Sequence, residues 1–314
     1  GRRQARRFSE FVYAPLSTSL TTYGASKSNA RRVAEETGVR LPRLYAEFPS
    51  YADIALSGLP DRFVLKSDIL SSRKGVYLML RQGDGYHDLF TKRTFTEAEL
   101  RDDLEGRVQG WQGTILAEEF VRGENGDGIP FDYKMYTFEG VVRHINQVNR
   151  NTDPPSIVFF DGDFEPVEPH RIARLSHRMQ PGKPVRPANW EQLLETAGRI
   201  ARHIDAPFVR VDTYTTGDDV VLGELTLRPG GFYRGLWQLA DELDVELGTY
   251  YSLAYRRRGL PIPIVEGLPP VLKEAAKAER ASRDPGIMAA SRLLARALGR
   301  KLKGSRKRKR GRNG

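Results

Sequence analysis

FVRVDTYTTGDDVVLGELTLRPGG, residues 208–231, is the stretch from which this chain of 314 residues is best interpreted. Two β-prone runs flank the turn TTGDD, a pattern that predicts a β-hairpin. Arg210 and Asp212 lie two residues apart on the first strand and therefore share a face. Glu224 and Thr226 do the same on the second strand, and pairing would bring Glu224 close to Asp212. Two carboxylates beside an arginine make a poor hydrophobic core, so this face is either functional or solvated.

Asp212 and Glu224 are candidates for holding a divalent cation. Mg²⁺ takes one or two protein carboxylates and completes its shell with substrate phosphates and water. The alternative is a solvated sheet face with a surface Arg–Asp pair, since exposed ion pairs are common. If the pair does hold a metal, the two carboxylates should repel each other in its absence. Neutralising either one should then leave stability unharmed.

Three lysines add a second signal. Lys66 ends a β-rich run beside the polar loop DILSSRKG, 68–75, and Lys134 lies in a predicted strand among aromatic residues. Lys27 opens a predicted helix, where a positive charge is unfavourable unless it faces an anion. Each lysine alone is more often simply solvated. Together with the carboxylate pair, they suggest a clamp for a triphosphate.

The rest of the chain predicts a mixture of short strands and helices. Expected strands lie at 63–67, 75–80 and 114–121, and two more lie within 132–148; expected helices lie at 26–40 and 189–204, with Asn189 as cap, and two lie within 271–303. The five histidines show no ligand spacing. Asp161 and Asp163 flank a glycine and predict a polar turn.

Composition excludes several classes of protein. There is no cysteine, so a thiol nucleophile, a cysteine-bound metal and a disulfide scaffold are excluded. The sequence has no Walker P-loop, no HExxH helix and no GxSxG elbow. The net charge is +10, but residues 1–7 carry four arginines and 299–314 carry nine Lys/Arg, neither with any acid, which leaves the chain between them at −3. Because a nucleic-acid domain usually carries its basic patch on the folded surface, we disfavour nucleic acid as a partner.

The order of these elements resembles the ATP-grasp superfamily, and within it the TupA-like ligases of teichuronopeptide synthesis. The resemblance covers about residues 20–255 and rests on five stretches in order: SKSNARRVAEETGVRLPRLY, FVLKSDILSSRKGVYLM, ILAEEFVRG, FDYKMYTFEGVVRHINQVNR and FVRVDTYTTGDDVVLGELTLRPGG. It implies an α+β fold in which two lobes grip ATP between antiparallel sheets, with a short N-terminal helical region and a helical basic C-terminal tail.

The resemblance also implies a division of the chain. The expected parts are a basic N-terminal segment (1–19), an N-terminal helical region (20–62), a small lobe with phosphate flap and hinge (63–125), a large lobe with metal and acceptor site (126–255), C-terminal helices (256–302) and a disordered basic tail (303–314).

Nucleotide-binding roles follow from the resemblance for ten residues. Lys27 and Lys66 would hold the α- and β-phosphates. Ser71, Ser72 and Gly75 would form the flap over the phosphates, Glu118, Glu119, Phe120 and Val121 the interlobe hinge that binds adenine, and Glu124 the ribose contact.

The resemblance assigns the remaining site residues to metal and substrate. Asp212 and Glu224 would ligate Mg²⁺ with Thr226, which stands where many relatives have Asn. Arg210 would neutralise the acyl phosphate, and Arg150 would handle substrate or the transferring phosphoryl group. Asp132 and Lys134 resemble an Asp-x-Arg strand with Lys in place of Arg, which weakens bidentate carboxylate recognition. Gly230 and Gly231 would lie against the acceptor.

The implied function is an ATP-dependent carboxylate–amine ligase that forms an amide through an acyl phosphate, using ATP and Mg²⁺. Its partners would be a carboxylate donor and an amine acceptor, with an amino acid added to a cell-envelope polysaccharide precursor or a related metabolite. We expect a cytoplasmic protein. Its basic C-terminal segment would be either an amphipathic helix on an anionic surface, which is the inner membrane face or an acidic glycan acceptor, or a docked helix with a solubilising tail. The alternatives are a kinase of the same fold, acting on a sugar or small molecule, and a non-catalytic basic-tailed binding protein.

Overall fold

The computed structural model describes residues 2–13, 27–68, 75–108, 113–124, 126, 128–229 and 235–266. Residues 4–264 form one compact unit, and the described residues 2–3 and 265–266 belong to a second one. The described chain begins with β1 (Arg2–Gln4) and ends with β17 (Ile264–Glu266). The expected flap serines, Gly230, Gly231, the C-terminal helices and the basic tail lie outside the described residues, as does the side chain of Lys27.

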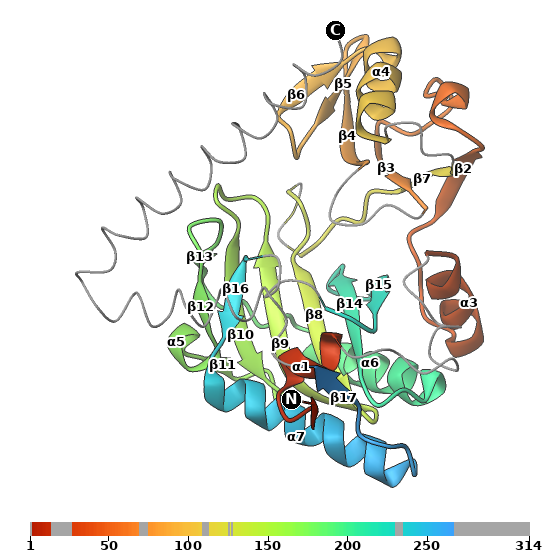
Figure 1. The fold of residues 1–314 in the computed structure, drawn as a ribbon. Helices are drawn as coiled ribbons and strands as arrows, with labels where there is room; N and C mark the ends of the chain where they lie inside the picture. Colours follow the sequence, from red (N-terminus) through yellow and green to blue (C-terminus); the bar gives the residue numbers. More distant parts are fainter. Residues whose placement is uncertain are drawn as a thin grey trace, which may run out of the picture. The chain divides into compact units, whose positions relative to one another are not determined.

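A six-stranded antiparallel sheet forms the smaller half of residues 4–264 (Figure 1). Its strands, in spatial order, are β2 (Leu44–Phe48), β7 (Ile115–Glu119), β3 (Arg62–Ser67), β4 (Val76–Gln82), β5 (Gly85–Asp88) and β6 (Arg93–Phe95). Helix α4 (Glu97–Val108) and the 3₁₀ turn η1 (Tyr51–Asp53) lie in the same half. Phe63 and Leu65 of β3 join the buried cluster that contains Leu100 of α4. The alternating side chains Val64 and Lys66 therefore face the opposite side of the sheet.

The larger sheet has the order β11-β10-β9-β8-β14-β15, with β13 parallel to β10. Its strands are β8 (Asp132–Phe138), β9 (Val141–Asn149), β10 (Ser156–Asp161), β11 (Pro166–Val167), β13 (Gln180–Pro181), β14 (Val209–Thr215) and β15 (Val220–Thr226). Helices α6 (Trp190–Ile204) and α3 (Lys27–Thr37) pack on one face, where they bury Tyr133, Met135, Val209 and Val211.

The opposite face of this sheet is aromatic at one end and charged at the other. Helix α1 (Phe8–Tyr13) inserts Phe8, which contacts Tyr136, Phe208 and Tyr251 of α7 (Asp241–Arg257) edge-on or tilted. Asp132 and Lys134 alternate with buried neighbours on the same strand as Tyr136 and so share its face. Helix α5 (Pro169–Ile172) and the pair β12 (Ala173–Leu175) and β16 (Trp237–Leu239) complete the described elements.

Most of the expected elements are confirmed, with some differences. β14 and β15 form the expected hairpin, and Asp212 pairs with Glu224 and Arg210 with Thr226. Residues 20–62, expected to be helical, also contribute β2, which is the edge strand beside β7. Asn189 precedes α6 but does not cap it with its side chain, because its Oδ1 accepts a hydrogen bond from the Thr215 hydroxyl at 2.7 Å. None of the described helices is long and apolar enough to cross a membrane.

His144 on β9 is a buried titratable group in the aromatic layer. Its ring stacks on Phe159 with centroids 5.7 Å apart and meets Tyr136 edge-on. Burial lowers the pKa of His144 to about 4, although hydrogen bonds to Asn146 and the Phe160 backbone act in the opposite direction. The imidazole is therefore neutral in the folded protein near pH 7, in keeping with a packing role.

His144 should make stability fall in mild acid. In the unfolded chain His144 takes up a proton near pH 6.5, whereas in the folded protein it does so only near pH 4. The stabilisation that depends on a neutral His144 is therefore complete above pH 6.5 and is lost as the pH falls towards 4. We expect a loss of about 3 kcal/mol over this window, measured by urea unfolding, and a smaller loss in His144→Gln. An unchanged pH profile in His144→Gln would contradict this assignment.

Candidate active site

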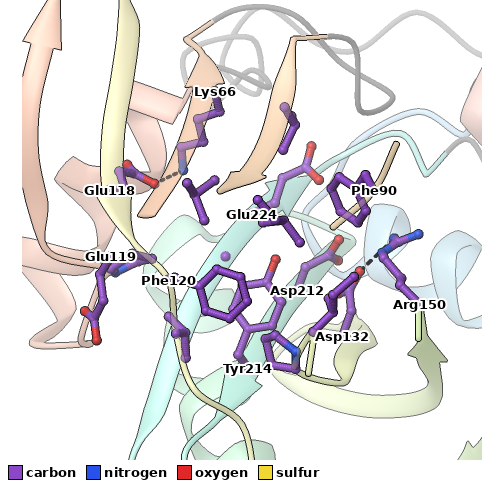
Figure 2. A pocket seen from close by; sticks show the side chains of 18 of the residues that line it. Lys66, Phe90, Glu118, Glu119, Phe120, Asp132, Arg150, Asp212, Tyr214 and Glu224 are labelled. Atoms are coloured by element: carbon purple, nitrogen blue, oxygen red, sulfur yellow. Dashed lines mark hydrogen bonds and ion pairs between the residues drawn. The ribbon is translucent and has the colours of Figure 1, made fainter. Parts of the chain in front are cut away.

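A pocket lies between the two sheets, and its lining contains both apolar and charged side chains (Figure 2). The apolar part is lined by Pro42, Val64, Val76, Leu78, Phe90, Phe120, Val121, Ile129, Pro130 and Tyr214. The charged part is lined by Lys66, Glu118, Asp132, Lys134, Arg150, Asp212 and Glu224. An apolar pocket with a few convergent polar groups is the usual form of a small-molecule site. Such a lining suits a ligand that has both apolar and charged parts.

On the small sheet, the carboxylate of Glu118 is shared by two cations. Lys66 forms an ion pair with one carboxylate oxygen, and Arg31 of α3 donates to the other at 2.5 Å. The register of β3 and β7 pairs Val64 with Glu118, which brings the neighbouring Lys66 within reach. Glu118 is buried, and each of its carboxylate oxygens has a cationic partner in place of water. Figure 2 shows Lys66 directed along the pocket towards Glu118.

The segment after β7 crosses from one sheet to the other and lines the apolar part. Phe120 and Val121 line the pocket, while the carboxylate of Glu119 points away from it (Figure 2). Arg40 donates to that carboxylate at 2.6 Å, and the Arg43 N–H donates at 3.0 Å. The backbone of Arg40 also accepts a hydrogen bond from the Leu222 N–H of β15. Arg40 thus ties the crossing segment to the large sheet.

On the large sheet, five side chains form a chain of alternating charge. Arg150 contacts Asp132 at 3.1 Å, and Lys134 contacts Asp132 at 2.8 Å and Asp212 at 2.5 Å. Arg210 completes the chain with two hydrogen bonds to Asp212, at 2.6 and 2.7 Å. The register places Lys134 opposite Asp212 across β8 and β14. We refer to these five residues as the ion chain.

Asp132, Asp212 and Arg210 of the ion chain are buried, while Lys134 and Arg150 are partly exposed. Burial acts to raise the pKa of Asp132, but Lys134 and Arg150 outweigh it and the pKa lies below its ordinary value. Burial acts to lower the pKa of Arg210, but Asp212 outweighs it and the pKa is raised. Oδ1 of Asp132 is buried and has no hydrogen-bond partner among the described residues. One carboxylate oxygen beside the pocket is therefore unsatisfied.

The expected metal pair is asymmetric. The side chain of Asp212 is 4% exposed and that of Glu224 is 52% exposed. Within the described part of the chain, the one ion contact of Glu224 is Arg210 at 3.8 Å, so its oxygens are available to a ligand. No group of three or more possible metal ligands occurs among the described residues. The two carboxylates fit a cation that takes most of its oxygen ligands from phosphates, as Mg²⁺ does, and they do not make an all-protein cage.

A β-bulge shapes the hairpin beside this pair. The register shifts after Asp212, so Gly223 is left between the pairs Asp212–Glu224 and Thr213–Leu222. A Cβ on Gly223 would lie 2.8 Å from the ring of Tyr214, closer than real contacts allow. Glycine is therefore required for Tyr214 to lie against the bulge and line the pocket.

The structure brings some of the sequence-predicted residues together in the pocket and leaves others outside it. The pocket lining includes Lys66, Glu118, Glu119, Phe120, Val121, Asp132, Lys134, Arg150, Asp212 and Glu224. Arg210 is buried behind Asp212, and the Thr226 hydroxyl accepts from Arg210 at 3.0 Å. Glu124 accepts from the Ala188 N–H at 3.3 Å and does not line the pocket. Gly75 follows the undescribed flap and has a φ of 65°, which favours glycine.

Arg31, Arg40 and Tyr214 are among the residues at or beside the site that were not predicted from the sequence. Arg31 lies four residues after Lys27 and so on the same side of α3, a spacing that marks it as a neighbour of that lysine. Arg40 carries no such signal, since its partner Glu119 is distant in sequence. Tyr214 continues the alternation Arg210–Asp212–Tyr214, so its place on the site face was available from the pattern.

A sequence profile of the family described as TupA-like ATPgrasp matches residues 18–252, most of the chain. The chain belongs to the TupA-like ATP-grasp family. Membership in this family supports an ATP-dependent ligase in general terms. It also identifies the fold as an ATP-grasp fold.

Solved structures show more distant likenesses, and the chain spans about two thirds of their length. D-alanine–D-alanine ligase from Bacillus anthracis is 14% identical, with 74% of this chain and 68% of that chain covered and a TM-score of 0.45. A RimK domain ATP-grasp protein from Sphaerobacter thermophilus is 14% identical, with coverage of 75% and 69% and a TM-score of 0.43. VanG D-Ala:D-Ser ligase from Enterococcus faecalis is 13% identical, with coverage of 76% and 63% and a TM-score of 0.46. No curated protein matches the sequence.

The ion chain reverses one expectation from the sequence. Neutralising Asp212 was expected to relieve repulsion, but Asp212 lies between Lys134 and Arg210 and balances both. Asp212→Asn should therefore destabilise the protein by about 3–5 kcal/mol, since it leaves buried cations uncompensated. Glu224→Gln, at the half-exposed partner, should change stability by less than about 1 kcal/mol. Urea unfolding of both variants without metal measures this, and an Asp212→Asn protein as stable as wild type would contradict the ion chain.

Proposed function

We propose that this protein is an ATP-dependent carboxylate–amine ligase that works through an acyl phosphate. The observation that carries the proposal is the lining of the pocket, in which apolar side chains, here called the apolar slot, accompany an array of lysine, arginine and carboxylate side chains. Family membership supports the ATP-dependent part of this statement. The array has no histidine or hydroxyl nucleophile among its described members, so catalysis would rest on positioning and charge neutralisation.

The apolar slot would hold the adenine ring. Val64, Leu78 and Phe120 offer apolar surface, and the backbone of the crossing segment at 119–121 offers hydrogen-bonding groups. The Glu119 side chain takes no part, because Arg40 and Arg43 hold it away from the slot. The proposal therefore assigns adenine recognition at this position to the main chain.

Lys66 would bind the phosphates. Its ammonium is among the charged groups that line the pocket, and it is paired with Glu118 in this structure. Arg31 holds the second oxygen of Glu118, so this carboxylate keeps a cation when Lys66 turns to a phosphate. Lys27, Ser71, Ser72 and Gly75 remain proposals for the same role.

Asp212 and Glu224 would hold Mg²⁺, which when bound neutralises phosphate oxygens and polarises the γ-phosphorus. Lys134 and Arg150 line the charged end and would orient the carboxylate substrate there. A carboxylate oxygen attacks the γ-phosphorus and ADP leaves with the bonding electrons. The amine then attacks the acyl carbon, and phosphate leaves as the nitrogen loses a proton. Arg210, behind Asp212, would act by fixing that carboxylate.

The finer proposal concerns the acceptor. We propose an amino acid joined to a cell-envelope polysaccharide precursor or a related metabolite, with Asp132, Gly230 and Gly231 at the acceptor. The basic segment 299–314 would attract an anionic surface, either lipid or glycan. The support for this acceptor is the family resemblance and the charge of the segment.

Hydroxylamine trapping tests the reaction. The protein is incubated with Mg²⁺, ATP and hydroxylamine together with panels of amino acids and uronic acids, and ADP and hydroxamate are measured. A ligase gives both, because hydroxylamine attacks an acyl phosphate. A kinase of the same fold gives ADP and a phosphorylated product without hydroxamate, which would overturn the proposal.

Lysine variants connect that reaction to the pocket. Lys66→Met should lower the rate of ADP formation by at least about 100-fold, as expected for loss of a cation aimed at transferring phosphate. Lys183→Met removes an exposed lysine outside the pocket and should keep the wild-type rate. Equal rates in the two variants would exclude the pocket as the site of the reaction.

A further inference from the structure

Lys134 and Arg210 share one carboxylate but are not equivalent partners. Arg210 donates to both oxygens of Asp212 and also to the Thr226 hydroxyl. Lys134 contacts only Oδ2 of Asp212, at 2.5 Å, the same oxygen that the Nη2 of Arg210 contacts. Asp212 therefore keeps two charge-assisted hydrogen bonds when Lys134 is removed.

Lys134 is also the partner that is able to leave. It lines the pocket, whereas Arg210 is buried and does not. Its ammonium is a compact charge on a flexible stem, in contrast to the planar fork of an arginine. A lysine held by carboxylates beside a cavity is exchangeable, and an arginine anchored at three points is fixed.

The register sets Lys134 and Glu224 on opposite sides of Asp212. Lys134 pairs with Asp212 across β8 and β14, and Asp212 pairs with Glu224 across β14 and β15. The three side chains therefore form one row across three strands. The oxygen that a divalent cation would take from Asp212 is already occupied by the Lys134 ammonium, while Glu224 is available.

We propose that Lys134 is the resident counter-ion of Asp212, which a divalent cation must displace, so that the metal binds well only together with the nucleotide. The proposal rests on the proposed function, since it takes Asp212 and Glu224 as metal ligands. Without nucleotide, displacement brings two more positive charges to a site that already holds Arg210, Lys134 and Arg150. With nucleotide, the phosphates accept the released ammonium. Lys134 thus couples metal binding to triphosphate binding.

Mn²⁺ binding without nucleotide tests this directly. The full chain is titrated with Mn²⁺ alone, and free Mn²⁺ is measured by its paramagnetic resonance signal. Lys134→Met should bind one Mn²⁺ at least about tenfold more tightly than wild type, a change of roughly 1.4 kcal/mol. The double variant Lys134→Met with Asp212→Asn should lose that gain.

Lys66→Met is the matched control. It removes the same charge from the same pocket, but its partner is Glu118 and not the proposed metal pair. It should stay within about twofold of wild type. An equal gain in Lys66→Met would show a general effect of pocket charge and would overturn the proposal, as would an unchanged affinity in Lys134→Met.

Two further measurements keep the outcome decisive. If Lys134→Met fails to fold, Lys134→Gln keeps a donor for Asp212 without the charge and should give a smaller gain in Mn²⁺ affinity. No gain in a folded Lys134→Gln would overturn the proposal.

Wild type and Glu224→Gln are also titrated with Mn²⁺ in the presence of ATP. Loss of Mn²⁺ binding in Glu224→Gln supports the metal site, so a failed Lys134 result then rejects only this inference. Unchanged binding in Glu224→Gln rejects the metal site itself.

Discussion

The ion pair between Lys134 and Asp212 is the interaction on which the site depends. It joins Arg150 and Asp132 on one side to Arg210 on the other, and it fixes the charged end of a sheet face whose other end is aromatic. Taking charges out of water costs several kcal/mol for each ion, and such pairs are often no better for stability than apolar packing. A partly buried ion chain that opens onto a pocket therefore indicates a function that needs those charges there.

The same arrangement occurs on both sides of the pocket. Glu118 is shared by Arg31 and Lys66, and Asp212 is shared by Arg210 and Lys134. In each case the carboxylate is buried and the lysine lines the pocket. If the lysines turn towards bound phosphates, each carboxylate keeps its hydrogen bonds to an arginine. The pocket would then bind a polyanion without leaving a buried carboxylate unpaired, the situation that costs the most.

The parts of this site that follow from local pattern were predictable from the sequence. The two-residue alternation of Arg210 and Asp212, and the turn before Val220, were enough to place Glu224 and Thr226 opposite them. The strand that contains Lys134 was also expected, but its register against β14 was not, since Arg210 and Lys134 belong to segments joined by a long connection. The expected repulsion between Asp212 and Glu224 was wrong for that reason.

Contacts between distant segments were the other part that the sequence could not supply. Arg31 and Glu118 are 87 residues apart, and Arg40 and Glu119 are 79 apart. The sequence of a single helix or strand does not predict which carboxylate in another segment its arginine contacts. Asn189 is a further example. Its position before α6 predicted a side-chain cap, but its oxygen accepts a hydrogen bond from Thr215, which lies on a strand distant in sequence.

The most direct measurement of this account is the position of Mn²⁺ in crystals grown with a non-hydrolysable ATP analogue, located by its anomalous scattering. The account predicts an anomalous peak between the carboxylates of Asp212 and Glu224, analogue phosphates beside it, and a Lys134 ammonium no longer on Asp212. A peak elsewhere, with Lys134 still paired to Asp212, would contradict it.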